Sequence, residues 1–376
     1  MHKKIISMLQ VAVLLLCCSG CWDSKDINDK AILATVLLDK QNGNYVFYVE
    51  VAHTDRSGGP EGQSASPEKF TIIRGEGKTL IEARDELDRR LKYPIYISAV
   101  RSLIITQNFA REDIAEYFNR LRADVEYRKK VISVTTDADP EELLNIFGRE
   151  ESVGLYIEKT LDQMTSYRQM IRRSSSIFIE SLSSKYCGFL IPDIGINQNM
   201  IDVKGFSVVL GSKVVGFIPA NEWNGIIFIN AGRPEIEYVI PFEDKMLTFL
   251  ISLNNRDIKP TYKNGIVKFD LKFDFKAELQ YTSGRCPCKF TEKQFDQMSD
   301  IITSVLKKDI EDAINTSQRK FGGDYFDFNR RFHAAYPTQY HKMSWDKAYS
   351  KAEFNVQVKV KTKELKMFDY RAHGAE

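Results

Sequence analysis

The stretch VKFDLKFDFKAEL, Val267–Leu279, has the most regular pattern in the chain. Apolar residues stand at every odd position of this stretch, and Lys, Asp or Glu stands at every even position. Because successive side chains of a strand point to opposite faces, this period of two predicts a strand that is buried on one face and open to water on the other. We therefore expect a C-terminal antiparallel sheet whose apolar face needs a second layer to cover it.

A long amphipathic helix follows this strand and can supply that layer. Thr291 and Gln294 form a capping box at its start, and Gly322-Gly323 ends it. About 28 helical residues span ~42 Å, which matches the roughly 43 Å of the thirteen-residue strand. The stretch AEFNVQVKVK, 352–361, repeats the alternation. These features predict a two-layer α+β domain over 241–376. The helix residues expected to face the sheet are Phe295, Met298, Ile302, Val305, Ile310, Ile314 and Phe321.

The first half of the chain alternates predicted strands with predicted helices, which is typical of a layered domain. Asp139 followed by Pro140 is a helix start, and Pro94 stops an earlier helix. We expect this N-terminal α/β-type domain to cover 21–190. The strands are expected at 45–53, 70–74, 95–106 and 131–136, and the helices at 79–91, 110–121 and within 152–185.

The middle of the chain contains a hairpin signal. In VKGFSVVLGSKVVGFI, 203–218, two β-branched runs flank Gly211-Ser212, a pair that suits a type II′ turn. The turn-rich residues 183–199 before it read as a linker. A small middle β-rich domain over 199–240 is therefore expected, and the predicted fold class is multidomain α+β with mixed or antiparallel sheets packed by helices.

The stretch LLLCCSGCWDSKDIND, Leu14–Asp29, ends an apolar run that begins after Lys3 and Lys4. The run is shorter than the roughly 20 residues of a membrane span, and its charged start and small residues Ser19-Gly20 are typical of a secretory signal peptide. We interpret residues 1–20 as a lipoprotein signal that is removed. Cys21 is then the lipidated first residue, with S-diacylglyceryl and N-acyl groups. The alternative is an ordinary signal that leaves Cys21 as a thiol.

Composition excludes some function classes. The chain of 376 residues has 53 Lys and Arg against 51 Asp and Glu, so it lacks the clustered positive excess that nucleic-acid binding needs. Cys187, Cys286 and Cys288 are too few for a disulfide framework, and the CPC spacing does not suit zinc. We interpret them as structural or incidental thiols, with one bridge to Cys187 as an alternative, and expect no metal and no cofactor.

No catalytic constellation is present in the sequence. It has no HExxH, GxSxG, Walker-type or GxGxxG motif, and RGEGKTL, 74–80, is explained by a turn that leads into a helix. The Gly-, Ser- and Pro-rich residues 54–69 predict a surface loop, with partner binding as the alternative. A basic cluster reads as a solvated face, with anionic lipid binding as the alternative. Its members are Arg120, Arg122, Arg128, Lys129 and Lys130. The residues thus favour a membrane-tethered, non-enzymatic binding or assembly protein.

Several stretches resemble the Ger(x)C family of spore germination lipoproteins. The start GCWDSKDIND matches through Cys21, Trp22, Asp23 and Ile27. The hairpin at 203–218 and the helix at 77–87 resemble family segments, and so do QRKFGGDYFDF, 318–328, and the residues 336–360. Asn329 and Tyr340 depart from the Gly and Trp that the family pattern favours there.

This resemblance implies the C subunit of a nutrient germinant receptor. Such a subunit is expected to be a three-domain α+β protein without known catalytic activity. It would be held by lipid at Cys21 on the outer face of the spore's inner membrane, beside the membrane-embedded A and B subunits. Trp22 and Asp23 would adjoin the anchor and orient the body. The alternative function is a substrate-binding lipoprotein of an ABC-type transporter, which would have two lobes around a polar ligand cleft.

Overall fold

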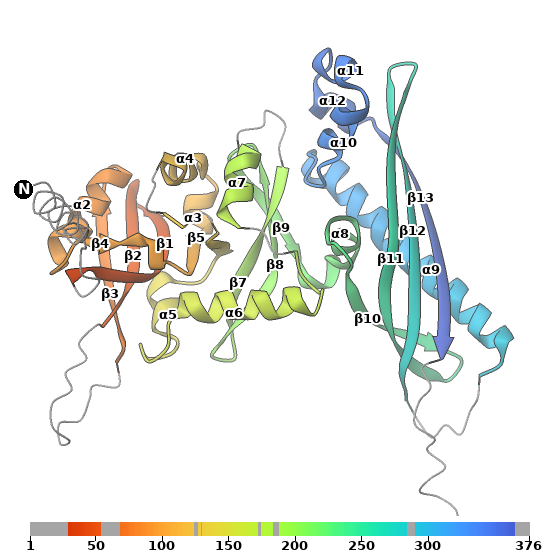
Figure 1. The fold of residues 1–376 in the computed structure, drawn as a ribbon, viewed down its shortest axis with the longest axis horizontal. Coiled ribbons are helices and arrows are strands. Elements are labelled where there is room, and N and C mark those ends of the chain that lie inside the picture. Colours follow the sequence, from red (N-terminus) through yellow and green to blue (C-terminus); the bar gives the residue numbers. More distant parts are fainter. Residues whose placement is uncertain are drawn as a thin grey trace, which may run out of the picture.

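The computed structural model describes residues 29–53, 68–123, 127–128, 130–171, 174–182, 188–283 and 290–364. Two mixed sheets packed by helices lie toward opposite ends of an elongated body (Figure 1). The prediction of a multidomain α+β fold is confirmed by these two layered assemblies.

The first sheet is built around four parallel strands. Strands β1, β5, β6 and β7 pair in parallel in that order, and antiparallel strands extend the sheet on both sides to give the order β3-β2-β1-β5-β6-β7-β8-β9. The short β4 pairs in parallel with the start of β1. The strands are β1 (Ala31–Gln41), β2 (Asn44–Ala52), β3 (Phe70–Gly77), β4 (Ile95–Tyr96), β5 (Ser102–Thr106), β6 (Ile132–Thr136), β7 (Gly188–Asn197), β8 (Met200–Leu210) and β9 (Lys213–Pro219).

Helices cover both faces of the first sheet (Figure 1). Leu87, Phe118 and Phe178 belong to the core on one face, and Ile157 belongs to the core on the other. The predicted cap Asp139 is confirmed, because its side chain accepts hydrogen bonds from the first turn of its helix. Thr79 caps the helix that begins at Leu80 in the same way. The helices are α2 (Leu80–Arg90), α3 (Gln107–Ala110), α4 (Ala115–Ala123), α5 (Pro140–Asn145), α6 (Val153–Ser166) and α7 (Ser175–Leu182), with a 3₁₀ turn η2 (Ile97–Ala99).

The second sheet contains the strand predicted at Val267–Leu279. All seven apolar residues of Val267–Leu279 are buried, as predicted, and the charged ones between them are not. Strands β10, β11 and β12 pair antiparallel, but β13 pairs in parallel with β12, so the sheet is not purely antiparallel as predicted. The strands are β10 (Glu235–Phe242), β11 (Lys245–Lys263), β12 (Ile266–Thr282) and β13 (Glu353–Glu364).

The long helix α9 (Glu292–Asn315) lies along this sheet, as predicted (Figure 1). Its capping box of Thr291 and Gln294 is confirmed. A π-helical segment η4 (Thr316–Phe321) continues it, and Gly322 ends the run with a φ of +69°. The residues of α9 that are buried against the sheet include Met298, Ile302, Leu306, Ile310 and Ile314. Three short helices precede β13, namely α10 (Phe328–Ala335), α11 (Pro337–His341) and α12 (Trp345–Tyr349).

Residues 199–240 are divided between the two sheets, whereas the sequence pattern grouped them in a small middle domain. The predicted linker at 183–199 instead contains β7, which pairs with β8 and so joins the hairpin of β8 and β9 to the first sheet. Burial of Phe189, Leu190 and Ile191 explains this strand. The segment after the hairpin forms η3 (Ala220–Glu222) and helix α8 (Asn224–Asn230), while β10 belongs to the second sheet. The domain boundaries expected at 21–190 and 241–376 stay predictions.

Several predicted features lie outside the described residues. These are the signal peptide, Cys21, Trp22, Asp23, Ile27, most of the loop at 54–69, and the cysteines Cys187, Cys286 and Cys288. Among the helices of the described ranges, none combines the length and the apolar composition that a membrane span requires.

Candidate functional site

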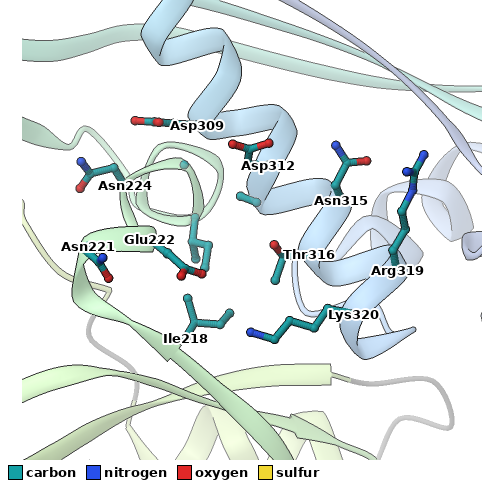
Figure 2. A pocket seen from close by; sticks show the side chains of 13 residues that line it. Ile218, Asn221, Glu222, Asn224, Asp309, Asp312, Asn315, Thr316, Arg319 and Lys320 are labelled. Atoms are coloured by element: carbon teal, nitrogen blue, oxygen red, sulfur yellow. The ribbon is translucent and has the colours of Figure 1, made fainter.

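A polar cleft lies where the two halves of the molecule meet (Figure 2). Its walls are η3 and α8 on one side and the C-terminal part of α9 with η4 on the other, and its volume is about 460 Å³. The side chains that carry its chemistry are Asn221, Glu222, Asn224, Asp309, Asp312, Asn315, Thr316, Arg319 and Lys320.

Close packing of α8 on α9 forms the back of the cleft. A Cβ atom added at Gly225 would lie 2.0 Å from the Asp309 carbonyl oxygen and 3.0 Å from the Ala313 Cβ. Glycine therefore lets the backbones of α8 and α9 approach one another at this position. The approach brings Asn224 and Glu222 opposite the acidic residues of α9 (Figure 2).

The π-helical segment η4 shapes the second wall. Ser317 Oγ donates a hydrogen bond to the Gly323 carbonyl at 2.7 Å and lies 2.6 Å from the Tyr349 hydroxyl. Gln318 Nε2 donates to the carbonyls of Tyr349 and Ala352. These contacts hold one side of the widened turn against α12 and the start of β13. Its other side presents Thr316 and Lys320 to the cleft (Figure 2). π-Helical turns occur frequently at functional sites.

Charges of both signs face the cleft. Lys320 extends toward Ile218 and Glu222, whereas the guanidinium of Arg319 turns away beside Asn315 (Figure 2). The Tyr238 hydroxyl donates to Asp309 Oδ2 at 2.5 Å, and burial raises the pKa values of both groups. Both walls thus carry carboxylates, Glu222 on the first and Asp309 and Asp312 on the second, and Lys320 on the second wall adds an ammonium group that faces Glu222. Such walls can hold a polar ligand or a polar partner segment by ion pairs and hydrogen bonds.

Other buried carboxylates are bound by the chain's own donors. Asp193 Oδ2 accepts hydrogen bonds from Thr135 Oγ1 at 2.7 Å, Gln107 Nε2 at 2.9 Å and Ser207 Oγ at 3.1 Å. Glu50 accepts from the Val153 amide at 3.0 Å, at the start of α6. In the described ranges, no group of three or more His, Cys, Asp and Glu residues is arranged to hold a metal ion.

The structure describes some of the residues predicted from the sequence, whereas others lie outside the described ranges. Of the basic cluster, Lys129 lies outside the described residues, while Arg128 forms an ion pair with Glu158 at 3.7 Å. The GKT turn leads into α2, as interpreted from the sequence, and the structure shows Thr79 as the N-cap of that helix. The cleft was not predicted. Its residues come from two segments about 90 positions apart, and no local spacing connects Glu222 with Asp309.

Comparison with known protein families connects this fold to a biological role. A model of the spore germination protein N-terminal domain matches residues 23–196, and a model described as spore germination B3/GerAC like, C-terminal, matches residues 204–365. The chain belongs to the Ger(x)C family of spore germination proteins. The two germination models meet near the junction of β7 and β8, and together they cover both sheets and the cleft.

Relatives of the germination family match nearly the whole chain. Spore germination protein B3 of Bacillus subtilis (strain 168) is 20% identical over 362 residues, which cover 93% of this chain and 94% of that protein. Putative spore germination protein YfkR of the same organism is 19% identical and covers 95% of each chain. The crystal structure of the GerBC protein matches with a TM-score of 0.54 at 16% identity, covering 90% of this chain and 99% of that one. This structural similarity to GerBC shows a shared fold.

Proposed function

We propose that this protein is the lipid-anchored, non-catalytic C subunit of a spore nutrient germinant receptor, required for the response to nutrients. The observation that carries the proposal is the match of both germination models, in order, to residues 23–196 and 204–365. The Cys-Trp-Asp start at Cys21 adds support, because it stands directly after an apolar run with a charged beginning.

Lipid on Cys21 provides the attachment in this proposal. A single acyl chain binds a membrane only marginally, whereas two or more chains hold a protein firmly. Diacylglyceryl and N-acyl groups on Cys21 hold the body on the outer face of the spore's inner membrane. There it assembles with the membrane-embedded A and B subunits. The charged cleft supports a binding role of this kind, because two separate elements contribute side chains suited to ion pairs with a partner.

Replacing Cys21 tests the proposal. Cys21→Ala is expected to release the protein from spore membranes and to impair germination with nutrients, because no thiol remains for the lipid. Cys288→Ala is the matched control, since it also removes one thiol but leaves Cys21 in place. Membrane fractionation and nutrient-triggered germination are the two measurements. A Cys21→Ala protein that stays on the membrane and supports normal germination contradicts the proposal.

A further inference from the structure

The topology of the first sheet brings many basic residues to one edge. Parallel strands β1, β5 and β6 all begin at the same edge of the sheet. Helix α4 connects β5 to β6 and returns to that edge, and α2 ends just before β4, which pairs with the start of β1. The residues at these starts and ends form what we call the basic edge, which consists of Lys30, Arg89, Arg90, Lys92, Arg101, Arg120, Arg122, Arg128 and Lys130.

Contacts confirm that these segments meet. A small apolar cavity of about 40 Å³ is lined by Leu33 and Ile95 of the strands, by Leu87 of α2 and by Arg120 of α4. Both helices therefore end over the start of β1. Arg101 and Arg128, which precede β5 and β6, both lie within ion-pair distance of Glu158, at 3.6 and 3.7 Å. Arg101 and Arg128 thus lie together at the edge where β5 and β6 begin.

The balance of charge on this surface is positive. The nine cations of the basic edge are accompanied, in the described ranges, by Asp29, Asp85, Asp88 and Glu158, and Glu86 forms an ion pair with Arg90. Arginines in the last turns of α2 and α4 complement the helix dipoles. The dipoles therefore explain why these two helices each end in arginines. The helix dipoles do not account for Lys92, Arg101 or Lys130, which stand outside those helices and are exposed.

The proposed anchor enters the body at this same edge. The Ala31 amide donates a hydrogen bond to the Pro94 carbonyl at 2.9 Å, which fixes the start of β1 beside the end of α2. Asp29 stands eight positions after Cys21, and eight steps of the chain reach at most ~29 Å when fully extended. A lipid on Cys21 therefore keeps the basic edge close to the bilayer surface. This step depends on the proposed function.

We propose that the basic edge docks on anionic phospholipid headgroups, so that the body stands on the membrane by the edge where its parallel strands begin. Each Lys or Arg close to an anionic bilayer contributes favourable electrostatic energy that falls off within a Debye length. The aromatic ring of Tyr93, with the Lys92 ammonium 4.9 Å from its centroid, lies at this edge. Aromatic residues favour the membrane interface, which adds to the electrostatic attraction.

Vesicle binding without the lipid anchor tests the inference. The probe is the mature chain carrying Cys21→Ser, mixed with vesicles of phosphatidylcholine alone or of phosphatidylcholine with phosphatidylglycerol. We expect sedimentation with the phosphatidylglycerol vesicles only, and weaker binding as salt is added. Absence of binding to the anionic vesicles, or equal binding to both vesicle types, overturns the inference.

A pair of charge-matched variants assigns the surface. Replacing Arg89, Lys92, Arg120 and Arg122 with Gln is expected to lower the vesicle partition coefficient on the order of tenfold or more. The control replaces four exposed lysines of the second half with Gln, namely Lys263, Lys272, Lys342 and Lys359. It removes the same charge and is expected to bind as the parent does. Equal loss in both variants overturns the assignment to the basic edge.

Two further measurements separate this inference from the proposed function. Thermal melting of the Gln variants checks that they fold, and replacing the three arginines with Lys instead is expected to retain vesicle binding, because the charge is kept. Loss of binding in a folded Lys variant contradicts an electrostatic mechanism. Mass spectrometry of Cys21 in the native protein tests the lipid alone, so an unmodified Cys21 contradicts the anchor while leaving the vesicle result intact.

Discussion

Asp324 is a fully buried carboxyl group that holds the segment before α10 in place. Its Oδ2 accepts hydrogen bonds from the Asn329 amide at 2.7 Å and from the Trp345 indole at 3.1 Å. Its Oδ1 accepts from the amides of Phe326 and Phe328. Burial nevertheless raises the pKa of Asp324 from 3.8 to about 6, because desolvation of the charge exceeds the stabilisation by these donors. The group therefore makes the stability of the fold depend on pH.

We expect Asp324 to stabilise the protein more as the pH falls. The pKa of Asp324 is higher in the folded state than in the unfolded state, so the folded state binds the proton more tightly. The contribution is complete below about pH 4 and is lost as the pH rises through about 6. A shift of about 2 pKa units corresponds to ~3 kcal/mol. Urea unfolding across this range should show a smaller pH dependence for Asp324→Asn than for the parent, and identical slopes contradict the assignment.

At the residue scale, the sequence predicts the role of a residue where its partners are close along the chain, and misses it where the partners are distant. Asp139 and Thr291 were predicted as caps, because a cap acts on amides two or three residues away. Asp193 was not recognised, since its donors Thr135 and Ser207 come from other strands of the sheet. Only the strand order brings those hydroxyl groups to a buried carboxyl group.

At the element scale, periodicity predicted the half-buried elements and missed the fully buried ones. Strand β12 has one solvent-exposed face, so apolar and charged residues alternate along its sequence. Strand β7 is buried on both faces over most of its length, and Pro192 and Gly195 within it resemble turn residues. Helix α8 is short and mostly buried, which leaves no polar stripe to mark its period. Parallel pairing of β13 depends on the return path through α10–α12, which no local pattern encodes.

The contact between α8 and α9 gives a prediction at the scale of elements. Gly225→Ala is expected to destabilise the protein by about 1–3 kcal/mol, because the new methyl group would overlap the Asp309 carbonyl. This penalty must exceed the gain of up to ~1 kcal/mol that alanine brings to a helix. Gly232→Ala is the control, since a Cβ atom there meets nothing within 4 Å. Chemical unfolding measures both, and a Gly225→Ala protein as stable as the parent contradicts the close approach.

At the scale of the whole molecule, buried residues of both sheets and of α8 belong to one hydrophobic core. Phe228 of α8 lies 6.2 Å from the Tyr238 ring and 4.9 Å from the Phe275 ring of the second sheet, measured between ring centroids. The cleft and the basic edge are also properties of the whole molecule. The sequence shows Arg120, Arg122 and Arg128 as a local cluster, but only the parallel strand order brings Arg89 and Lys92 to the same edge of the sheet.

The first sheet also has a core of its own, which predicts a partial unfolding. Phe118, Phe178 and Phe189 pack together on the face of that sheet away from α6 and do not depend on the second sheet. Phe273, by contrast, is 1% exposed between the second sheet and its covering helix. Placing a carboxylate there without a partner costs several kcal/mol, which the second sheet cannot offset.

Phe273→Asp is therefore expected to unfold the second sheet while the first stays folded. Amide hydrogen exchange should show lost protection in β11, β12 and β13 and retained protection in β1 and β5, because the strands of the first sheet keep their own core. Lys272→Asp is the matched control, since it places the same carboxylate on the exposed face of the same strand. Parental protection throughout would contradict the burial of Phe273 in the second sheet, and protection lost in β1 and β5 as well would contradict a separate core of the first sheet.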